Sequence, residues 1–144
     1  MVKFTVYIDG ISGTGKSSVV SQLKKDFTDS TIDLRDSSPL TQLVSDQNNN
    51  LPDRLSDDLY IILDADVSIC RQRIINHCLN NNISDNNPLH QESNLFMFRC
   101  LYYQLATKYT LHLINTNDVS IIEICDWVRM IIEDHIREIS FQRK

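Results

Sequence analysis

Glycine is the residue that this chain most clearly lacks. Only three of its 144 residues are glycine, whereas glycine makes up about 7% of an average protein. All three, Gly10, Gly13 and Gly15, lie within one short stretch near the start of the chain. The sequence therefore does without glycine everywhere except where the backbone must approach something closely or turn sharply.

Three further absences exclude whole classes of protein. No apolar run approaches the length of about 18 residues needed to span a membrane, and no signal peptide is evident, so we expect no membrane association. The net charge is −5, without the positive excess typical of general nucleic-acid binding. The four cysteines form no Cys-x-x-Cys pair, which argues against a metal site and indicates a reducing, cytoplasmic location.

The glycines belong to a recognisable pattern. Residues 10–17, Gly10-Ile11-Ser12-Gly13-Thr14-Gly15-Lys16-Ser17, fit the phosphate-binding loop G-x-x-x-x-G-K-[ST]. Apolar and polar residues alternate before it, as in a β-strand, and apolar residues recur at helical spacing after it. Strand, loop and helix in this order form the context that the pattern requires. We therefore predict that these eight residues, together with Ser18, bind ATP.

Each residue type in the loop has a physical task. Glycine permits positive φ and brings backbone N–H groups close to an anion, while the N-terminus of the following helix contributes its dipole. Lys16 is expected to reach the β- and γ-phosphates, and Ser17 to hold Mg²⁺. ATP and Mg²⁺ are thus the expected cofactors. The alternative, a chance glycine turn, does not account for the Lys and Ser that follow Gly15.

Strand and helix patterns alternate along the rest of the chain. We predict strands over about 2–9, 31–35, 59–64 and 111–115 and helices over about 16–27, 67–80, 91–109 and 119–139. Ser120 and Glu123 suggest a capping box for the last helix. The pattern predicts a single α/β domain over 1–144: a P-loop three-layer sandwich with about four parallel strands, in sheet order 2-1-3-4, and helices on both faces.

The ligand of such a sheet lies beyond the carboxyl ends of its strands. Asp36, Asp64 and Asn115 end or follow predicted strands and belong to that edge, like the phosphate loop. Asp36 could orient the acceptor or a magnesium-bound water, or cap the turn before Pro39. Asp64 could be a magnesium ligand, or could cap the next helix. Asp9 could face the acceptor from the first strand, or could be solvated.

The class of phosphate-loop protein can be narrowed. A GTPase needs a D-x-x-G motif after the loop, and no glycine follows Gly15. Residues 115–118, Asn-Thr-Asn-Asp, also differ from the N-K-x-D motif that reads guanine. Large motor and transport ATPases need longer chains. The small nucleoside and nucleotide kinases remain.

Three later segments resemble the thymidylate kinase and deoxynucleoside kinase family. The first, residues 58–66 (Asp-Leu-Tyr-Ile-Ile-Leu-Asp-Ala-Asp) with Arg71-Gln72-Arg73-Ile74, resembles its fourth strand and the helix leading to its lid. The second resembles its post-lid helix and comprises Gln91-Glu92-Ser93, Phe98-Arg99 and Tyr102-Tyr103-Gln104-Leu105-Ala106. The third, Leu113-Ile114-Asn115 with the last helix, resembles its C-terminal end. The resemblance covers about 1–27 and 58–140, in the same order.

This resemblance implies ATP- and Mg²⁺-dependent phosphoryl transfer to a deoxynucleoside monophosphate, as in thymidylate kinases. The partner would be a small nucleotide or nucleoside, and the family's tendency to dimerise suggests a homodimer. The residues implied are Lys16, Asp36, Arg71 and Arg73 for catalysis, Asp9, Asp36 and Arg99 for the substrate, and Ser17 and Asp64 for the metal. Arg71 and Arg73 could instead be exposed helix residues, and Arg99 could pair with a carboxylate such as Glu92.

The chain also departs from the family pattern. Members are usually longer, and the shortfall lies between about 28 and 57, where the family shapes its acceptor pocket. Ser37 stands where arginine is expected, and the lid from Asn80 to Gln91 contains no arginine. Ser12 stands where thymidylate kinases usually have Asp, which favours a deoxynucleoside (thymidine-type) kinase. The missing acceptor and lid residues favour a third alternative, a degenerate, non-catalytic nucleotide-binding module.

Overall fold

A four-stranded parallel sheet forms the centre of the computed structural model, which describes residues 3–27, 31–45 and 51–142. The strands are β1 (Phe4–Asp9), β2 (Ile32–Arg35), β3 (Leu59–Asp64) and β4 (His112–Asn115). Their order in the sheet is β2-β1-β3-β4, which confirms the predicted order. Val6 of β1 pairs with Leu34 on one side and Leu59 on the other, and Ile62 of β3 pairs with Leu113.

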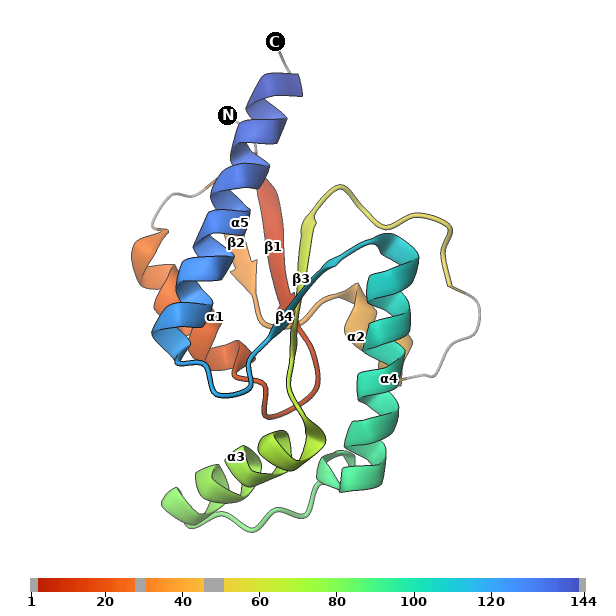
Figure 1. Ribbon diagram of the computed structural model, residues 1–144, viewed down its shortest axis with the longest axis vertical. Coiled ribbons are helices and arrows are strands. Elements are labelled where there is room, and N and C mark those ends of the chain that lie inside the picture. The colour runs from red at the N-terminus through yellow and green to blue at the C-terminus, as the bar shows by residue number, and fades with distance from the viewer. Residues whose placement is uncertain (1–2, 28–30, 46–50, 143–144) are drawn as a thin grey trace.

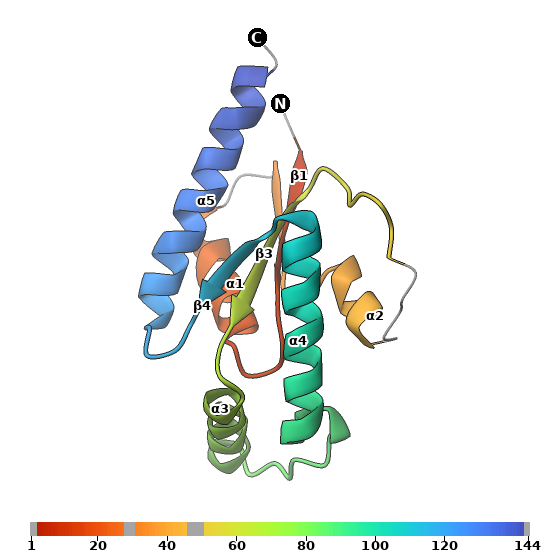
Figure 2. The same ribbon diagram turned by 45° about the vertical axis from the view of Figure 1, so that its right-hand side comes forward.

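Helices cover both faces of this sheet. They are α1 (Lys16–Asp26), α2 (Pro39–Ser45), α3 (Val67–Asn80), the short 3₁₀ helix η1 (Pro88–His90), α4 (Glu92–Tyr109) and α5 (Ile121–Gln142). Figures 1 and 2 show α1 and α5 on one face and α2 and α4 on the other, with α3 beyond the carboxyl ends of the strands. Within the described ranges, no helix has the length and apolar character to cross a membrane.

The central strand β3 explains why both faces are covered. All six of its residues are buried, and successive side chains of a strand point to opposite faces. Ile61 and Leu63 pack with α1 and α5, whereas Tyr60 and Ile62 pack with α2, α3 and α4. Burying one such side chain stabilises the fold by about 1.5–3 kcal/mol. The continuous apolar run in the sequence is therefore the signature of a strand with two dry faces.

The structure differs from the sequence prediction around α2. Helix α2 was not predicted, because its seven residues are too few for a clear helical pattern. It begins with Pro39 at the first helical position, where proline is favoured. Its cap is Ser38, whose Oγ accepts the N–H of Leu40 at 3.0 Å, so Asp36 is not the cap. The predicted strand residue Val2 lies outside the described residues.

Helix α5 begins and ends slightly later than predicted, at Ile121 and Gln142. Ser120 precedes it, and its Oγ accepts the N–H of Glu123 at 3.2 Å. The Glu123 carboxylate bonds the Ser120 hydroxyl instead of the Ser120 backbone, also at 3.2 Å. Half of the predicted capping box is thus present.

Candidate active site

The phosphate-binding loop connects β1 to α1 and has the backbone that its glycines permit. Gly10, Gly13 and Gly15 all have positive φ, at 135°, 88° and 98°. A Cβ atom on Gly10 would lie 2.2 Å from the carbonyl oxygen of Leu63, and one on Gly13 would lie 2.6 Å from that of Cys70. Both the conformation and the closeness of β3 and α3 therefore require glycine here. This explains why the chain keeps its glycines at this place.

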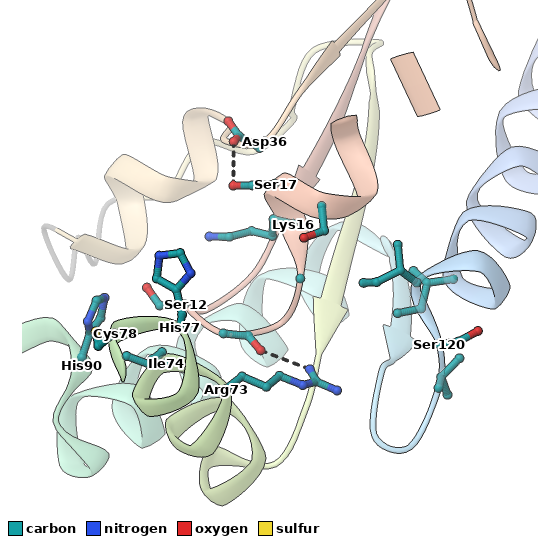
Figure 3. A pocket seen from close by; sticks show the side chains of 16 residues that line it. Ser12, Lys16, Ser17, Asp36, Arg73, Ile74, His77, Cys78, His90 and Ser120 are labelled. Atoms are coloured by element: carbon teal, nitrogen blue, oxygen red, sulfur yellow. Dashed lines mark hydrogen bonds between the residues drawn. The ribbon is translucent and has the colours of Figure 1, made fainter. Parts of the chain in front are cut away.

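A pocket of about 780 Å³ opens beside this loop. Figure 3 shows Lys16 and Ser17 on the loop side, with Arg73, Ile74, His77 and Cys78 of α3 and His90 of η1 around them. The remaining wall is formed by Val119, Ser120, Ile121 and Ile124 at the start of α5. The pocket thus has cationic groups next to the loop and an apolar wall opposite, which suits a ligand with a charged end and a flat apolar part.

Lys16 carries the positive charge of the loop. Its Nζ donates a hydrogen bond to the carbonyl oxygen of Gly10 at 2.7 Å. Burial lowers the pKa of Lys16, and the carboxylates of Asp9 and Asp36 act in the opposite direction. A partly dehydrated ammonium interacts strongly with an anion, because the local dielectric screens it less than bulk water does. The structure therefore places a lysine in the wall of the pocket, beside the backbone of the loop.

Ser17 and Asp36 meet although they come from different elements. Ser17 lies in the first turn of α1 and Asp36 follows β2. The Ser17 hydroxyl donates to Asp36 Oδ2 at 3.1 Å (Figure 3). Both residues line the pocket. Hydroxyl and carboxylate oxygens are ligands that Mg²⁺ prefers. The residues present therefore fit a magnesium site between the phosphate loop and β2.

Asp9 is buried, with only 1% of its surface exposed. Its Oδ1 accepts the N–H of Gly10 and the hydroxyl of Tyr102, both at 2.8 Å. Its Oδ2 accepts the hydroxyls of Ser38 at 2.5 Å and Thr41 at 2.9 Å. The carboxylate thus ties the phosphate loop to α2 and α4. Its predicted contact with a substrate stays a prediction, whereas solvation, the other alternative, is wrong.

A second polar group forms around the buried Asp64, with the half-buried Arg99 beside it. Arg99 donates from Nε to Asp64 Oδ1 at 2.8 Å and from Nη2 to Oδ2 at 3.0 Å, and the Tyr103 hydroxyl donates to Oδ2 at 2.6 Å. Arg99 therefore pairs with a carboxylate, but with Asp64 and not with Glu92. Asp64 does not cap α3, whose N-cap is Asp66. Neither Asp64 nor Arg99 lines the pocket, so their metal and substrate roles stay predictions.

The two arginines of α3 point to different places. Arg73 lines the pocket and donates to the carbonyl oxygens of Gly13 at 3.1 Å and Thr116 at 2.8 Å. Arg71 donates to Asp85 Oδ2 in the lid segment at 2.6 Å. Residues two apart on a helix do not share a face, which accounts for the divergence. Arg73 thus stabilises the loop through Gly13, and Arg71 connects α3 to the lid segment through Asp85.

Sequence reasoning missed several pocket residues. His77 follows Arg73 by four residues, and Cys78 follows Ile74 by four, so helical spacing alone could have placed them on the pocket side. His90 lies in η1, and no periodicity marks it. No group of three or more His, Cys, Asp or Glu side chains suited to hold a metal ion occurs in 3–27, 31–45 and 51–142.

The sheet order, the loop and the pocket together define a P-loop kinase fold. Neither a protein-family model nor a curated protein matches this chain. Solved structures do match: deoxyadenosine kinase from M. mycoides with bound dCTP has a TM-score of 0.68 at 12% identity, covering 91% of this chain and 100% of that one. The same enzyme with the products dCMP and a flexible dCDP has a TM-score of 0.66, with the same identity and coverage. At this identity the likeness concerns the fold.

Proposed function

We propose that this protein is a phosphotransferase that moves the γ-phosphate of ATP to a deoxynucleoside-type acceptor. The observation that carries the proposal is the Ser17–Asp36 contact at 3.1 Å beside Lys16, in one pocket. A phosphoryl-transfer site needs positive charge at the donor phosphates and an anionic group that orients what approaches them. These residue types meet here from α1 and from the segment that follows β2.

The roles follow from the contacts. Backbone N–H groups of the loop and Lys16 would bind the donor phosphates, and Ser17 with Asp36 would hold Mg²⁺. When bound, Mg²⁺ would neutralise charge on the phosphate chain. Asp36 would also orient the acceptor hydroxyl by accepting its hydrogen bond. Arg73 would keep the loop in place through its bond to the Gly13 carbonyl.

The acceptor could be a deoxynucleoside or a deoxynucleoside monophosphate. Thymidylate kinases would predict a deoxynucleoside monophosphate, whereas Ser12 in the loop favoured a nucleoside. The matched structures are deoxyadenosine kinases, and this supports a deoxynucleoside acceptor over a monophosphate. We therefore propose a deoxynucleoside, without assigning its base.

A coupled assay of ADP release tests the proposal. We expect turnover with at least one deoxynucleoside across a panel of deoxynucleosides and their monophosphates, with ATP and Mg²⁺. Lys16→Ala should abolish turnover, and Lys24→Ala, on the exposed side of α1, is the matched control. Turnover in Lys16→Ala would contradict the loop-based mechanism. Turnover with monophosphates alone would overturn the choice of acceptor.

Asp36→Asn separates catalysis from nucleotide binding. The substitution keeps the shape and removes the charge, so we expect turnover to fall by about 10²–10⁴-fold while ATP still binds through the loop. Asp33→Asn, on the exposed side of β2, is the matched control. Unchanged turnover in Asp36→Asn would remove Asp36 from the mechanism.

One observation favours the second candidate, a nucleotide-binding module without catalysis. Arg99, the residue expected to bind the acceptor, already forms two hydrogen bonds to Asp64. An acceptor would have to displace this pairing, which is costly for a charge pair that is largely buried. ATP binding without turnover on any acceptor would decide for this candidate.

We also propose the cellular setting that such a kinase needs. ATP-dependent transfer fits the cytoplasm, and the four cysteines are free thiols, as in a reducing compartment. A homodimer is expected from the family resemblance. Light scattering would show a particle of twice the chain mass of 16.7 kDa if it forms, and a single mass at high concentration would contradict it.

A further inference from the structure

A histidine held by a carboxylate lies in the wall of the pocket. His90 of η1 lines the pocket together with Lys16 and Ser12 (Figure 3). Its Nδ1 lies 2.8 Å from Asp85 Oδ1, and the other oxygen of Asp85 accepts a hydrogen bond from Arg71 at 2.6 Å. The Asp85 side chain is only 13% exposed. The lid segment is therefore fixed to α3 by Asp85, and His90 is fixed by the same carboxylate.

The hydrogen-bond partner determines the state of the ring. An ionised carboxylate can only accept, so Nδ1 of His90 must carry a hydrogen. Nε2 lies 3.5 Å from the amide nitrogen of Asn87, at the outer limit of a hydrogen bond. A second proton on Nε2 would make the ring an imidazolium with a donor that a stronger acceptor can recruit. His77, on the same wall, contacts Asn81 and not a carboxylate.

The other cations of the pocket already have partners. Lys16 donates to the Gly10 carbonyl, and Arg73 donates to Gly13 and Thr116. The lid from Asn80 to Gln91 contains no arginine. An anion bound at the loop would therefore face His90 on the side of the lid segment.

We propose that His90, oriented by Asp85, binds the phosphate chain of the nucleotide as an imidazolium, so that binding takes up a proton and weakens as the pH rises. The inference rests on the proposed nucleotide binding at the loop and adds the group that contacts the phosphates from the lid. A bound phosphate would accept a hydrogen bond from Nε2 while Asp85 accepts one from Nδ1, and this arrangement needs a hydrogen on both ring nitrogens.

Other charged groups near the His90 ring influence its protonation when a nucleotide binds. Hydrogen bonds from Arg71 and His90 lower the pKa of Asp85, so this carboxylate stays ionised over the range in which histidine titrates. Arg71 and Lys16 oppose a further positive charge, whereas a bound phosphate chain outweighs them. Besides His90, the ionisable side chains that line the pocket or bond to the lid segment there are those of Lys16, Asp36, Arg71, Arg73, His77, Cys78 and Asp85.

Calorimetry with a non-hydrolysable ATP analogue and Mg²⁺ tests the proposal in the full chain. Titrations in two buffers of different ionisation enthalpy measure the protons taken up. In the wild type we expect proton uptake near neutral pH. For His90→Gln we expect about tenfold weaker binding below about pH 6 and wild-type affinity above about pH 8. Comparing the two proteins removes the titration of the nucleotide itself, which is common to both.

Two further variants complete the test. Asp85→Asn keeps the shape of the lid but removes the charge that faces Nδ1, so the pH at which affinity declines should move down. His112→Gln, at the start of β4 and outside this pocket, should match the wild type. Equal affinity of wild type and His90→Gln at every pH overturns the role of His90 and leaves the proposed function standing. No binding by the wild type overturns both.

Discussion

At the scale of single residues, the glycines of the loop differ in which atoms leave no room for a side chain. A Cβ on Gly10 would meet the backbone oxygen of Leu63 at 2.2 Å, whereas one on Gly15 would lie 3.3 Å from Cδ1 of Ile121, the movable end of a side chain. We expect Gly15→Ala to lower the free energy of unfolding by about 1 kcal/mol and Gly10→Ala by about 3 kcal/mol or more. Urea unfolding measures both. The reverse order would contradict the close approach of β3.

Asp9 is a buried carboxylate that connects several elements. Its two oxygens accept four hydrogen bonds, among them those from Gly10 and Tyr102. In Asp9→Asn the new NH₂ group would face donors, so we expect a loss of about 1–3 kcal/mol in the free energy of unfolding. Asp33→Asn, on the exposed side of β2, should change it by less than about 0.5 kcal/mol. Similar values for both variants, measured by urea unfolding, would show that the buried bonds contribute little.

At the scale of elements, α5 carries His135, whose surroundings predict that stability depends on pH. Nε2 of His135 is buried without a hydrogen-bond partner in the described part of the chain, and its ring packs at 5.0 Å against Phe4 of β1. Burial lowers the pKa of His135, while Glu138 and Asp58 raise it and His112 lowers it further.

The sign follows from this lowered pKa. The folded state binds the proton less readily than the unfolded chain, so the contribution is complete above about pH 6.5 and is lost as the pH falls through the folded pKa. His135→Phe keeps the packing on Phe4 and removes this titration. Its unfolding free energy should therefore fall less between pH 8 and pH 5 than that of the wild type. An equal fall in both proteins would exclude His135 as the cause.

The elements also show what the sequence could predict and why. Strands β1 and β3 and helices α1, α3 and α4 were predicted within one or two residues, because long periodic patterns reflect burial directly. The short helices α2 and η1 were missed, because a helix of one or two turns depends on tertiary packing such as that of Leu40 and Val44.

The residues of the candidate site also fall into those that a local sequence pattern predicts and those that it does not. The glycine turn between β1 and α1 was predicted, because its glycines and the flanking strand and helix patterns lie in consecutive residues. The partners of Arg99 and His90 were not, because Asp64 precedes Arg99 by 35 residues and Asp85 lies in an irregular segment. Contacts between distant side chains depend on the packing of helices against the sheet, which no local pattern records.

At the scale of the whole molecule, the pocket joins parts that pack on opposite faces of the sheet. Ile74 of α3 belongs to the apolar cluster with α2 and α4, and Ile124 of α5 belongs to the cluster with α1. Both side chains line the pocket beside Lys16. A ligand bound there should therefore stabilise the entire fold and not one layer of it.

Thermal unfolding with ATP and Mg²⁺ measures this coupling. Ligand at about 100 times its Kd adds about 2.7 kcal/mol to the free energy of unfolding, which for a domain of this size raises the Tm by about 5–10 °C. The transition should stay single, because the ligand contacts elements from both clusters. The rise in Tm should disappear in Lys16→Ala and remain in Lys24→Ala. EDTA should reduce the rise in Tm, because it removes the cation that Ser17 and Asp36 would share with the phosphates. Two separate transitions, or the same shift in Lys16→Ala, would mean that the nucleotide binds elsewhere.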